Sequence, residues 1–236
     1  MYTLNFKVTP TYCDTRKRLS FNGMLQMMQD TDELWLTSEP SIIRYFEENE
    51  MTQVLVSRQV DVIRVPQYGE NLTVTSRVYE MKGVTGFRNT VIYDERGDAC
   101  YVSWSQGAFV DRKSGRLKRV SPEAIATMTN ETKEEMDYLD RRIDIPDVEP
   151  AVLPPIEIRR HDIDYNLHVN NTVYIRGALE LLPESFEVER MRVEHKVPAH
   201  FGDVLEPRIY DLSDRVVVAL SVNDTIAALI EFTPKS

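Results

Sequence analysis

The sequence predicts an α+β fold built from two copies of one plan, each an antiparallel sheet curled around a single helix. Each half of the chain runs from a strand through a polar loop to one helical pattern, and then to strands rich in Val, Tyr and Thr. In addition, residues 65–72 resemble residues 197–205, with one extra residue in the second segment. An internal duplication explains both observations, and two such units side by side form a duplicated α+β architecture.

In the first half, a helix is predicted to begin after Ser20, whose hydroxyl can cap a free backbone N–H. Phe21, Met24 and Met28 recur on one stripe of this helix, which we expect to extend to Leu36. Alternating apolar patterns bounded by turn signals predict the strands of this half. These strands are expected at residues 2–8, 53–63, 71–80, 86–94 and 100–110.

The second half repeats this order. A helix is expected at residues 171–182, with Asn170 or Asn171 as its cap. Strands are expected at residues 156–160, 187–197, 204–211, 215–223 and 225–232. Between the halves, residues 122–139 are compatible with a short helix and residues 144–155 with an acidic, Pro-rich extended linker. The predicted domains are therefore residues 1–120, a linker over 121–155, and residues 156–236.

Composition excludes several classes of protein. A chain of 236 residues with 42% hydrophobic and 28% charged residues is typical of globular proteins, and its net charge of -10 argues against non-specific nucleic-acid binding. No apolar run approaches the ~18 residues of a membrane span, and the N-terminus lacks a signal-peptide core. Cys13 and Cys100 have no partner at zinc or disulfide spacing. We expect a cytoplasmic protein without a cofactor or metal.

Residues 161–174 carry the densest run of groups that bond or transfer protons, just ahead of the second helical pattern. Asp164, Asn166 and His168 alternate within it. In an extended segment, their carboxylate, amide and imidazole would point to one side and could converge on one pocket. This arrangement indicates hydrolytic chemistry, although the same residue types are common in loops.

The repeat indicates which half is catalytic. When Asp14 is set against Asp164, Arg16 stands where the second copy has Asn166, and Arg18 where it has His168. The first copy therefore keeps the acid but has lost the amide and the imidazole. Only the second copy is expected to run the reaction.

At these residues the chain resembles the acyl-acyl carrier protein thioesterases of plants and bacteria. The family pattern, roughly D-x-N-x-H-V-N-N-x-x-Y-x-x-x-x-x-E-x-x-P, is matched by Asp164, Asn166, His168, Val169, Asn170, Asn171, Tyr174, Glu180 and Pro183. The resemblance implies a tandem (double) hot-dog fold, two antiparallel sheets each wrapped around a central helix. It implies hydrolysis of fatty acyl-acyl carrier protein, and a homodimer. Asp164, Asn166 and His168 would be catalytic, and the first hot dog would shape the acyl-chain tunnel.

One departure from the family matters. Plant members carry a Glu-Cys pair where this chain has Pro198 and Ala199, so a cysteine nucleophile is not available at that site. A thioester is activated enough for attack by water when a base and an oxyanion donor are positioned. Asp164 could be that base, or a nucleophile through an acyl anhydride. The helix that follows Asn170 could supply backbone N–H groups to the oxyanion.

Other polar residues are weaker candidates. Glu194 is a candidate assisting residue, although a solvated strand face is the simpler explanation; His195 is a similar case and His200 is weaker still. A metal cluster around His161 and His168 follows no standard ligand spacing. The candidate substrate-binding residues are Asn170, Asn171 and Met28.

Two further functions fit the same pattern. One is hydrolysis of acyl-coenzyme A, whose pantetheine arm is the same, and the other is a non-catalytic acyl-thioester-binding protein. Basic clusters such as Arg116, Lys118 and Arg119 are usually solvated faces, but they could also dock an acidic carrier protein.

Overall fold

The computed structural model describes residues 1–129 and 131–235 of the chain. It divides into two compact units, unit 1 with residues 1–56 and 62–138 and unit 2 with residues 57–61 and 139–236. Asn130, inside the predicted linker, and Ser236, at the end of the predicted second half, lie outside the described residues. None of the helices in the described part of the chain is long and apolar enough to span a membrane.

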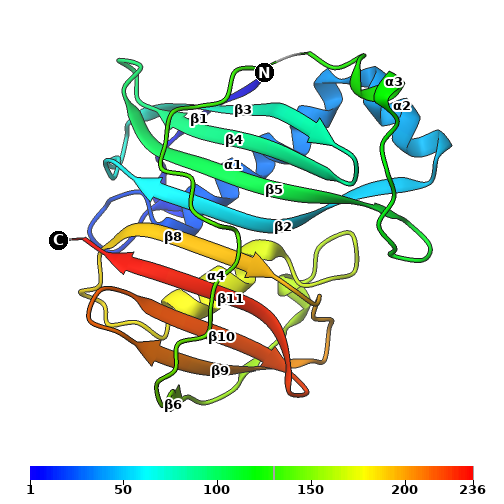
Figure 1. Cartoon of the computed structure of the whole chain (residues 1–236). Coiled ribbons are helices and arrows are strands. Elements are labelled where there is room, and N and C mark those ends of the chain that lie inside the picture. Colours follow the sequence, from blue (N-terminus) through cyan, green and yellow to red (C-terminus); the bar gives the residue numbers. More distant parts are fainter. Residues whose placement is uncertain (130, 236) are drawn as a thin grey trace. The chain divides into compact units, whose positions relative to one another are not determined.

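Unit 1 is an antiparallel sheet packed against a long helix. In sheet order its strands are β1 (Tyr2–Lys7), β3 (Asn71–Lys82), β4 (Thr85–Tyr93) and β5 (Ala99–Asp111). The helix α1 (Phe21–Leu34) contacts β1, β3 and β4, and Figure 1 shows it running behind these strands. The strand predicted at residues 53–63 is β2 (Met51–Val62), whose residues 57–61 fall in unit 2. The predicted strands and helix of this half are therefore present, with bounds that differ by one or two residues.

Helix α1 starts where the sequence predicts it. Ser20 is the N-cap, and its Oγ accepts a hydrogen bond from the Gly23 backbone N at 3.0 Å. A Cβ atom on Gly23 would stand 2.7 Å from the carbonyl oxygen of Tyr12, so this position excludes any side chain. The helix ends at Leu34 rather than Leu36, because Trp35–Ser38 continues as a 3-10 turn.

A second helix of unit 1, α2 (Pro40–Glu48), is absent from the prediction, which allowed only one helix in this half. It has nine residues and buries only Ile42 and Phe46, one turn apart. Its sequence is nevertheless amphipathic and begins with Pro40, a residue that favours the first position of a helix, so the prediction missed a signal that was present. Packing of its apolar face stabilises a helix too short to be stable alone.

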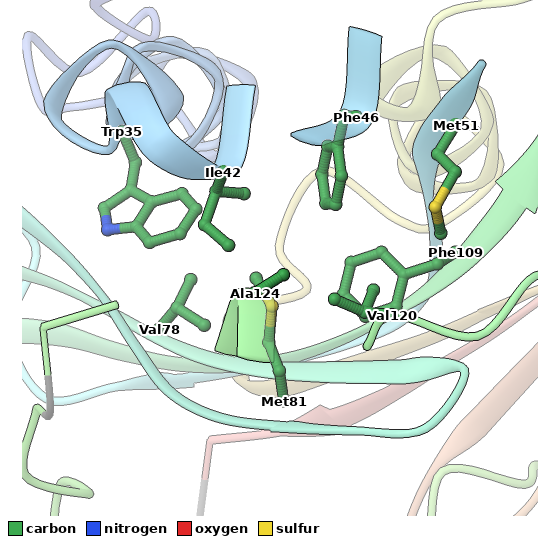
Figure 2. Close-up of a cluster of buried hydrophobic side chains, with 9 residues drawn as sticks. All are labelled: Trp35, Ile42, Phe46, Met51, Val78, Met81, Phe109, Val120 and Ala124. Carbon is green, nitrogen blue, oxygen red and sulfur yellow. The ribbon is translucent and has the colours of Figure 1, made fainter. Parts of the chain in front are cut away.

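These two residues belong to a buried cluster that joins α2 to the sheet. Ile42 lies beside Trp35 above Val78 of β3, and Phe46 faces Phe109 of β5 (Figure 2). The Phe46 and Phe109 rings are tilted, with centroids 5.5 Å apart. Met51, Met81, Val120 and Ala124 complete the cluster. Burial of each Val, Ile, Phe or Met side chain of this cluster contributes about 1.5–3 kcal/mol.

Unit 2 has the same plan with shorter elements. Its sheet order is β2, β8, β11, β10, β9 and β6, and β7 also pairs with β9. Here β2 is represented by residues 57–61 of the strand Met51–Val62. The other strands are β6 (Ala151–Val152), β7 (Ile156–Glu157), β8 (Val188–His195), β9 (Val204–Asp211), β10 (Val216–Val222) and β11 (Thr225–Pro234). Helix α4 (Asn171–Leu179) contacts β10 and β11.

The segment between the predicted halves differs most from expectation. The helix suggested over residues 122–139 is only α3 (Pro122–Ile125), capped by Ser121, and the described residues 131–139 have no regular secondary structure. Tertiary contacts explain the difference. The Tyr138 hydroxyl donates to Oδ1 of Asn89 at 3.1 Å, and Arg77 forms an ion pair with Glu134 at 2.6 Å. These contacts hold the segment against the sheet in an irregular conformation and override its tendency to form a helix.

The strand predicted at residues 156–160 also stops early. It ends at Glu157, and a 3-10 helix (Arg160–Asp162) follows it. The backbone N of Arg159 donates to Oδ2 of Asp162 at 2.8 Å, which stabilises this turn. Both units pack a helix on an antiparallel sheet, which confirms the α+β prediction.

Candidate active site

Asp164, Asn166 and His168 lie in one tight turn of unit 2. The prediction of an extended segment is wrong, because the Asp164 carboxylate folds the chain back on itself. Its Oδ1 accepts hydrogen bonds from the backbone N atoms of Asn166, at 2.8 Å, and His168, at 3.4 Å. The backbone N of Asp164 in turn donates to the His168 carbonyl at 2.9 Å. The three residues are brought together by this turn, with Asn166 exposed and the other two half-buried.

The turn places its fourth residue, Leu167, in the left-handed region of backbone conformation. Its φ is 63°, an uncommon value for a non-glycine residue, and its side chain is 76% exposed. The backbone N of Leu167 donates to the Asp164 carbonyl at 3.0 Å. This bond and the carboxylate contacts together hold the unfavourable conformation, which fixes the direction in which His168 leaves the turn.

The first half of the chain contains the same turn. Oδ1 of Asp14 accepts from the backbone N atoms of Arg16 and Arg18, at 2.9 and 2.8 Å, and the backbone N of Asp14 donates to the Arg18 carbonyl at 2.8 Å. Lys17, at the position of Leu167, has a φ of 58°. The duplication inferred from the sequence therefore extends to individual hydrogen bonds, while the side chains at the third and fifth positions differ.

After the turn, the chain enters α4 through a cap at Asn170. Its Oδ1 accepts from the backbone N of Thr172 at 3.0 Å and from the Thr172 hydroxyl at 2.8 Å. Its own backbone N donates to the Asp162 carbonyl at 2.8 Å. The capping prediction is confirmed for Asn170, whereas Asn171 is the first residue of the helix.

Asp162 anchors the turn to the helix from the other side. Its side chain is nearly buried, and its Oδ1 lies 2.5 Å from Nη2 of Arg176 on α4. His161, one residue earlier, is largely exposed, with its Nε2 3.4 Å from the same oxygen. Among the residues that the structure describes, no three His, Cys, Asp or Glu side chains are grouped as metal ligands would be.

A second loop, after β8, lies against the turn of Asp164, Asn166 and His168. The backbone N of Val169 donates to the Ala199 carbonyl at 2.9 Å, and the buried backbone N of Ala199 donates to the Tyr174 hydroxyl at 2.8 Å. Burial raises the pKa of Tyr174, although the bond from Ala199 opposes this shift. Ala199 and Tyr174 thus tie this loop, the turn and α4 together. The sequence gives no signal for this role of Tyr174, because its ring fits the apolar stripe of the helix.

His200 extends from this loop towards the turn. The centroids of the His168 and His200 rings are 4.9 Å apart, with 51° between their planes. Nδ1 of His200 is 3.4 Å from the Leu167 carbonyl oxygen. His200 is thus close to the candidate residues, although the sequence indicated only a weak candidate for a site residue at this position. In the sequence, aligning Gly69 with Gly202 places His200 opposite Gln67 of the first copy. The structure supports this alignment, because both glycines have positive φ values, 90° and 93°.

The remaining histidine of the chain, His195, is enclosed. Its Nε2 is buried, and the described residues provide no hydrogen-bond partner for it. Its ring meets that of Tyr174 edge to face at 5.6 Å. Burial first, and then the nearby Arg58 charge, lower the pKa of His195 to about 4. His195 is therefore neutral at neutral pH.

Glu194, the candidate assisting residue, is occupied by other groups. It is buried, and its Oε1 lies 3.1 Å from Nζ of Lys196 and 3.5 Å from Nη1 of Arg141. Its Oε2 accepts from the backbone N of Ile143 at 3.3 Å. These contacts attach the segment before β6 to the sheet. Met28, the candidate substrate-binding residue of the first half, is fully buried in α1 of unit 1.

Both parts of the chain match models of one family. The family described as "Acyl-ACP thioesterase N-terminal domain" matches residues 1–128, and "Acyl-ACP thioesterase C-terminal domain" matches residues 147–221. A curated relative, the acyl-[acyl-carrier-protein] hydrolase FATB3 of Cuphea viscosissima, a chloroplastic protein, is 28% identical over 163 residues. That match covers 65% of this chain but only 39% of the length of the relative.

Solved structures of similar proteins share the fold over nearly the whole chain. An acyl-ACP thioesterase from Bacteroides thetaiotaomicron has a TM-score of 0.89 at 18% identity, covering 99% of this chain and 97% of that one. A 12:0-ACP thioesterase from Umbellularia californica has a TM-score of 0.85 at 16% identity, with the same coverage of both chains. These likenesses confirm the tandem hot-dog fold. Because the family models cover most of both halves, the chain belongs to the acyl-ACP thioesterase family.

Proposed function

We propose that this chain hydrolyses the thioester of fatty acyl-acyl carrier protein, releasing a free fatty acid and ending chain elongation. Membership of the acyl-ACP thioesterase family supports the activity. One structural observation carries the assignment of the site. The turn built by an aspartate occurs in both halves, but only the second copy places an amide and an imidazole on it, at Asn166 and His168.

We assign the proton transfer to His168. Its imidazole removes a proton from water, whose oxygen forms a bond with the thioester carbonyl carbon. The carbon–sulfur bond then breaks, the fatty acid is released and the proton returns to the pantetheine thiolate. Asn166, exposed at the tip of the turn, positions the thioester through its amide. The backbone N–H of Asn171, the first residue of α4, is the proposed donor to the oxyanion.

Asp164 enters the proposal as the residue that shapes this turn. Its Oδ1 is engaged by two backbone N–H groups, and Asp14 makes the same contacts in a turn that carries no imidazole. Such conservation of geometry without chemistry favours a positioning role for Asp164. It argues against the alternatives of base and of nucleophile, which the sequence left open. Glu194 supports the sheet in this proposal instead of assisting the reaction.

The acyl carrier protein is the proposed partner, and the cytoplasm the proposed compartment. Both cysteines are free, as expected in a reducing compartment. We assign the choice of acyl-chain length to the first half, in which Met28 is the candidate residue. A homodimer is proposed from the family resemblance, and the mass of the native protein in solution would test it.

The test is turnover of acyl-acyl carrier protein substrates of graded chain length by the purified chain. Wild type should release free acid, and His168→Ala should lower kcat at least ~10²-fold while the protein stays folded. The same acyl chain on coenzyme A separates the alternative enzyme, because a preference for coenzyme A would redirect the assignment. Binding of acyl-acyl carrier protein without release of acid would indicate a non-catalytic acyl-thioester protein.

A further inference from the structure

The imidazole of His200 faces that of His168 across two loops that are bonded to each other. The ring centroids are 4.9 Å apart, and Nδ1 of His200 is 3.4 Å from the carbonyl oxygen of Leu167. We propose that His200 is a positioning residue, which holds the His168 ring in its reactive orientation. This inference rests on the proposed thioesterase function.

The backbone of His200 is fixed relative to the turn. Its own N–H donates to Oδ2 of Asp203 at 2.8 Å. The preceding residue, Ala199, is held on both sides, since its N–H donates to the Tyr174 hydroxyl and its carbonyl accepts from Val169. The His200 side chain therefore starts from a rigid base, although the residue itself is exposed.

The atom that His200 reaches belongs to the peptide group joining Leu167 to His168. Leu167 has a left-handed backbone, so this peptide is held in an uncommon orientation. When Nδ1 of His200 carries the hydrogen, it can donate to the Leu167 carbonyl and restrain that peptide. Contact between the rings limits rotation of the His168 side chain at the same time. Both restraints reduce the orientational freedom that the reaction would otherwise have to remove.

The first copy separates this role from general support of the fold. There the backbone N of Leu19 donates to the Pro66 carbonyl at 2.8 Å, and the backbone N of Gln67 donates to Oε1 of Glu70 at 2.6 Å. These bonds match those of Val169 and His200. Arg18 and Gln67 also pair there as an isolated bridge. The two loops can thus be joined without imidazoles, and only the second copy carries imidazoles at both positions.

Three variants test the proposal. His200→Phe keeps a ring of similar size but removes the donor, and should lower kcat about tenfold with KM within about twofold and an unchanged melting temperature. His200→Gln carries the amide found at Gln67, which can donate to the Leu167 carbonyl, and should recover most of the lost kcat. Gln67→Phe, at the matching place in the first copy, should leave kcat unchanged.

A second readout does not depend on turnover. The ¹⁵N signals of the His168 ring report its tautomer and surroundings, and they should shift in His200→Phe but not in Gln67→Phe. In a His168→Ala background, His200→Phe should cause no further loss of the residual rate, because its effect passes through His168.

Unchanged kcat and unchanged His168 signals in His200→Phe would overturn the inference. The inference would also be overturned if His200→Phe lowered the residual rate of the His168→Ala variant by the same factor as it lowers the wild-type kcat. His200 would then act independently of His168. The proposed function fails in a different way, by the absence of acid release from acyl-acyl carrier protein by the wild type, whatever the His168 signals show.

Discussion

Asp14 and Asp164 make the same turn in the two halves of the chain. In each, Oδ1 accepts hydrogen bonds from the backbone N atoms two and four residues later, and the aspartate N–H donates to the carbonyl of the fifth residue of the turn. The turn is thus a property of the shared scaffold. The side chains that it presents, arginines in one copy and an amide and an imidazole in the other, determine where chemistry can occur.

This pair offers an internal control for the role of Asp164. Asp164→Ala removes the acceptor of two backbone N–H groups, and should cost about 1 kcal/mol of stability and lower kcat at least ~10²-fold as the turn loosens. Asp14→Ala should cause a similar loss of stability with kcat within about twofold of wild type. Thermal unfolding and steady-state turnover of acyl-acyl carrier protein measure both.

Asp164→Asn distinguishes the two roles of the aspartate. Asparagine keeps an oxygen that can accept the same backbone bonds, so a positioning role predicts a kcat within about tenfold of wild type. If Asp164→Asn is as inactive as Asp164→Ala, the carboxylate itself takes part in the reaction and the positioning role is wrong.

A second matched pair tests the third position of the turn. Asn166→Ala should lower kcat at least ~10²-fold, because the amide that positions the thioester is lost. Arg16→Ala, at the same position of the first copy, should leave turnover unchanged. Both residues are exposed, so the unfolding curves should coincide with that of wild type. Near-wild-type turnover of Asn166→Ala would remove this residue from the site.

The cysteines are expected to be chemically silent. Cys100 is buried, and burial raises the pKa of its thiol even though Nη2 of Arg64 lies 3.3 Å from its sulfur. A thiol kept protonated is a poor nucleophile. Cys13 lies in the first copy, outside the turn that carries Asn166 and His168. Cys13→Ser and Cys100→Ser, singly or together, should therefore keep kcat within about twofold. Mass spectrometry of the trapped enzyme checks this directly, and an acyl group on either sulfur would refute it.

His195 should make the protein sensitive to mild acid. Burial and the Arg58 charge lower its pKa to about 4, whereas an unfolded histidine titrates near ~6.5. Between these values the unfolded state binds a proton that the native state does not. The contribution of neutral His195 to the free energy of unfolding is therefore fully present above pH ~6.5 and is lost as the pH falls towards 4. The loss between pH 6.5 and 5 should be at most about 2 kcal/mol.

Urea unfolding at several pH values measures this loss. His195→Phe keeps the edge-to-face contact with Tyr174 and cannot titrate, so its stability should depend less on pH over this range. Equal slopes for wild type and His195→Phe would show that other groups cause the acid sensitivity.

Met28 is the test of acyl-chain choice in the first half. It is fully buried on α1, so Met28→Trp should cost about 1–3 kcal/mol through overpacking and should shift preference towards shorter acyl chains if Met28 borders the tunnel. Met28→Ala should shift preference in the opposite direction. A folded Met28→Trp variant with the wild-type chain-length profile would place Met28 in the core alone.

The sequence predicted the elements whose patterns are long and regular. β9 has the predicted bounds, and α1 begins at the predicted residue because Ser20 provides a local cap. In such elements the apolar side chains recur on the face that is buried, so the pattern can be recognised in the sequence itself. The assignment of Asp164, Asn166 and His168 to one locality likewise needed only their spacing, while their catalytic roles remain proposals.

What the sequence did not predict depends on contacts between distant residues. Residues 131–139 are bound to the sheet through Tyr138 and Glu134, whose partners lie far away in the chain. The approach of His200 to His168 is similar, because the bond from Val169 to Ala199 brings their loops together. The local turn was misjudged for another reason, since an extended pattern does not reveal that the Asp164 carboxylate will accept bonds from its own backbone.

The division of β2 between the two units has a consequence for recombination of related enzymes. Residues 57–61 belong to unit 2, where Ser57–Asp61 pairs with β8, and Arg190 of that strand forms an ion pair with Asp61 at 2.6 Å. A fragment beginning after residue 139 would lack this strand and leave β8 as an open edge, which invites aggregation. In a chimaera joined at the linker, residues 57–61 would come from a different parent than the rest of the second unit, to whose sheet they belong. A working exchange of the second half must therefore include residues 57–61, and the gene segments to be shuffled are not contiguous.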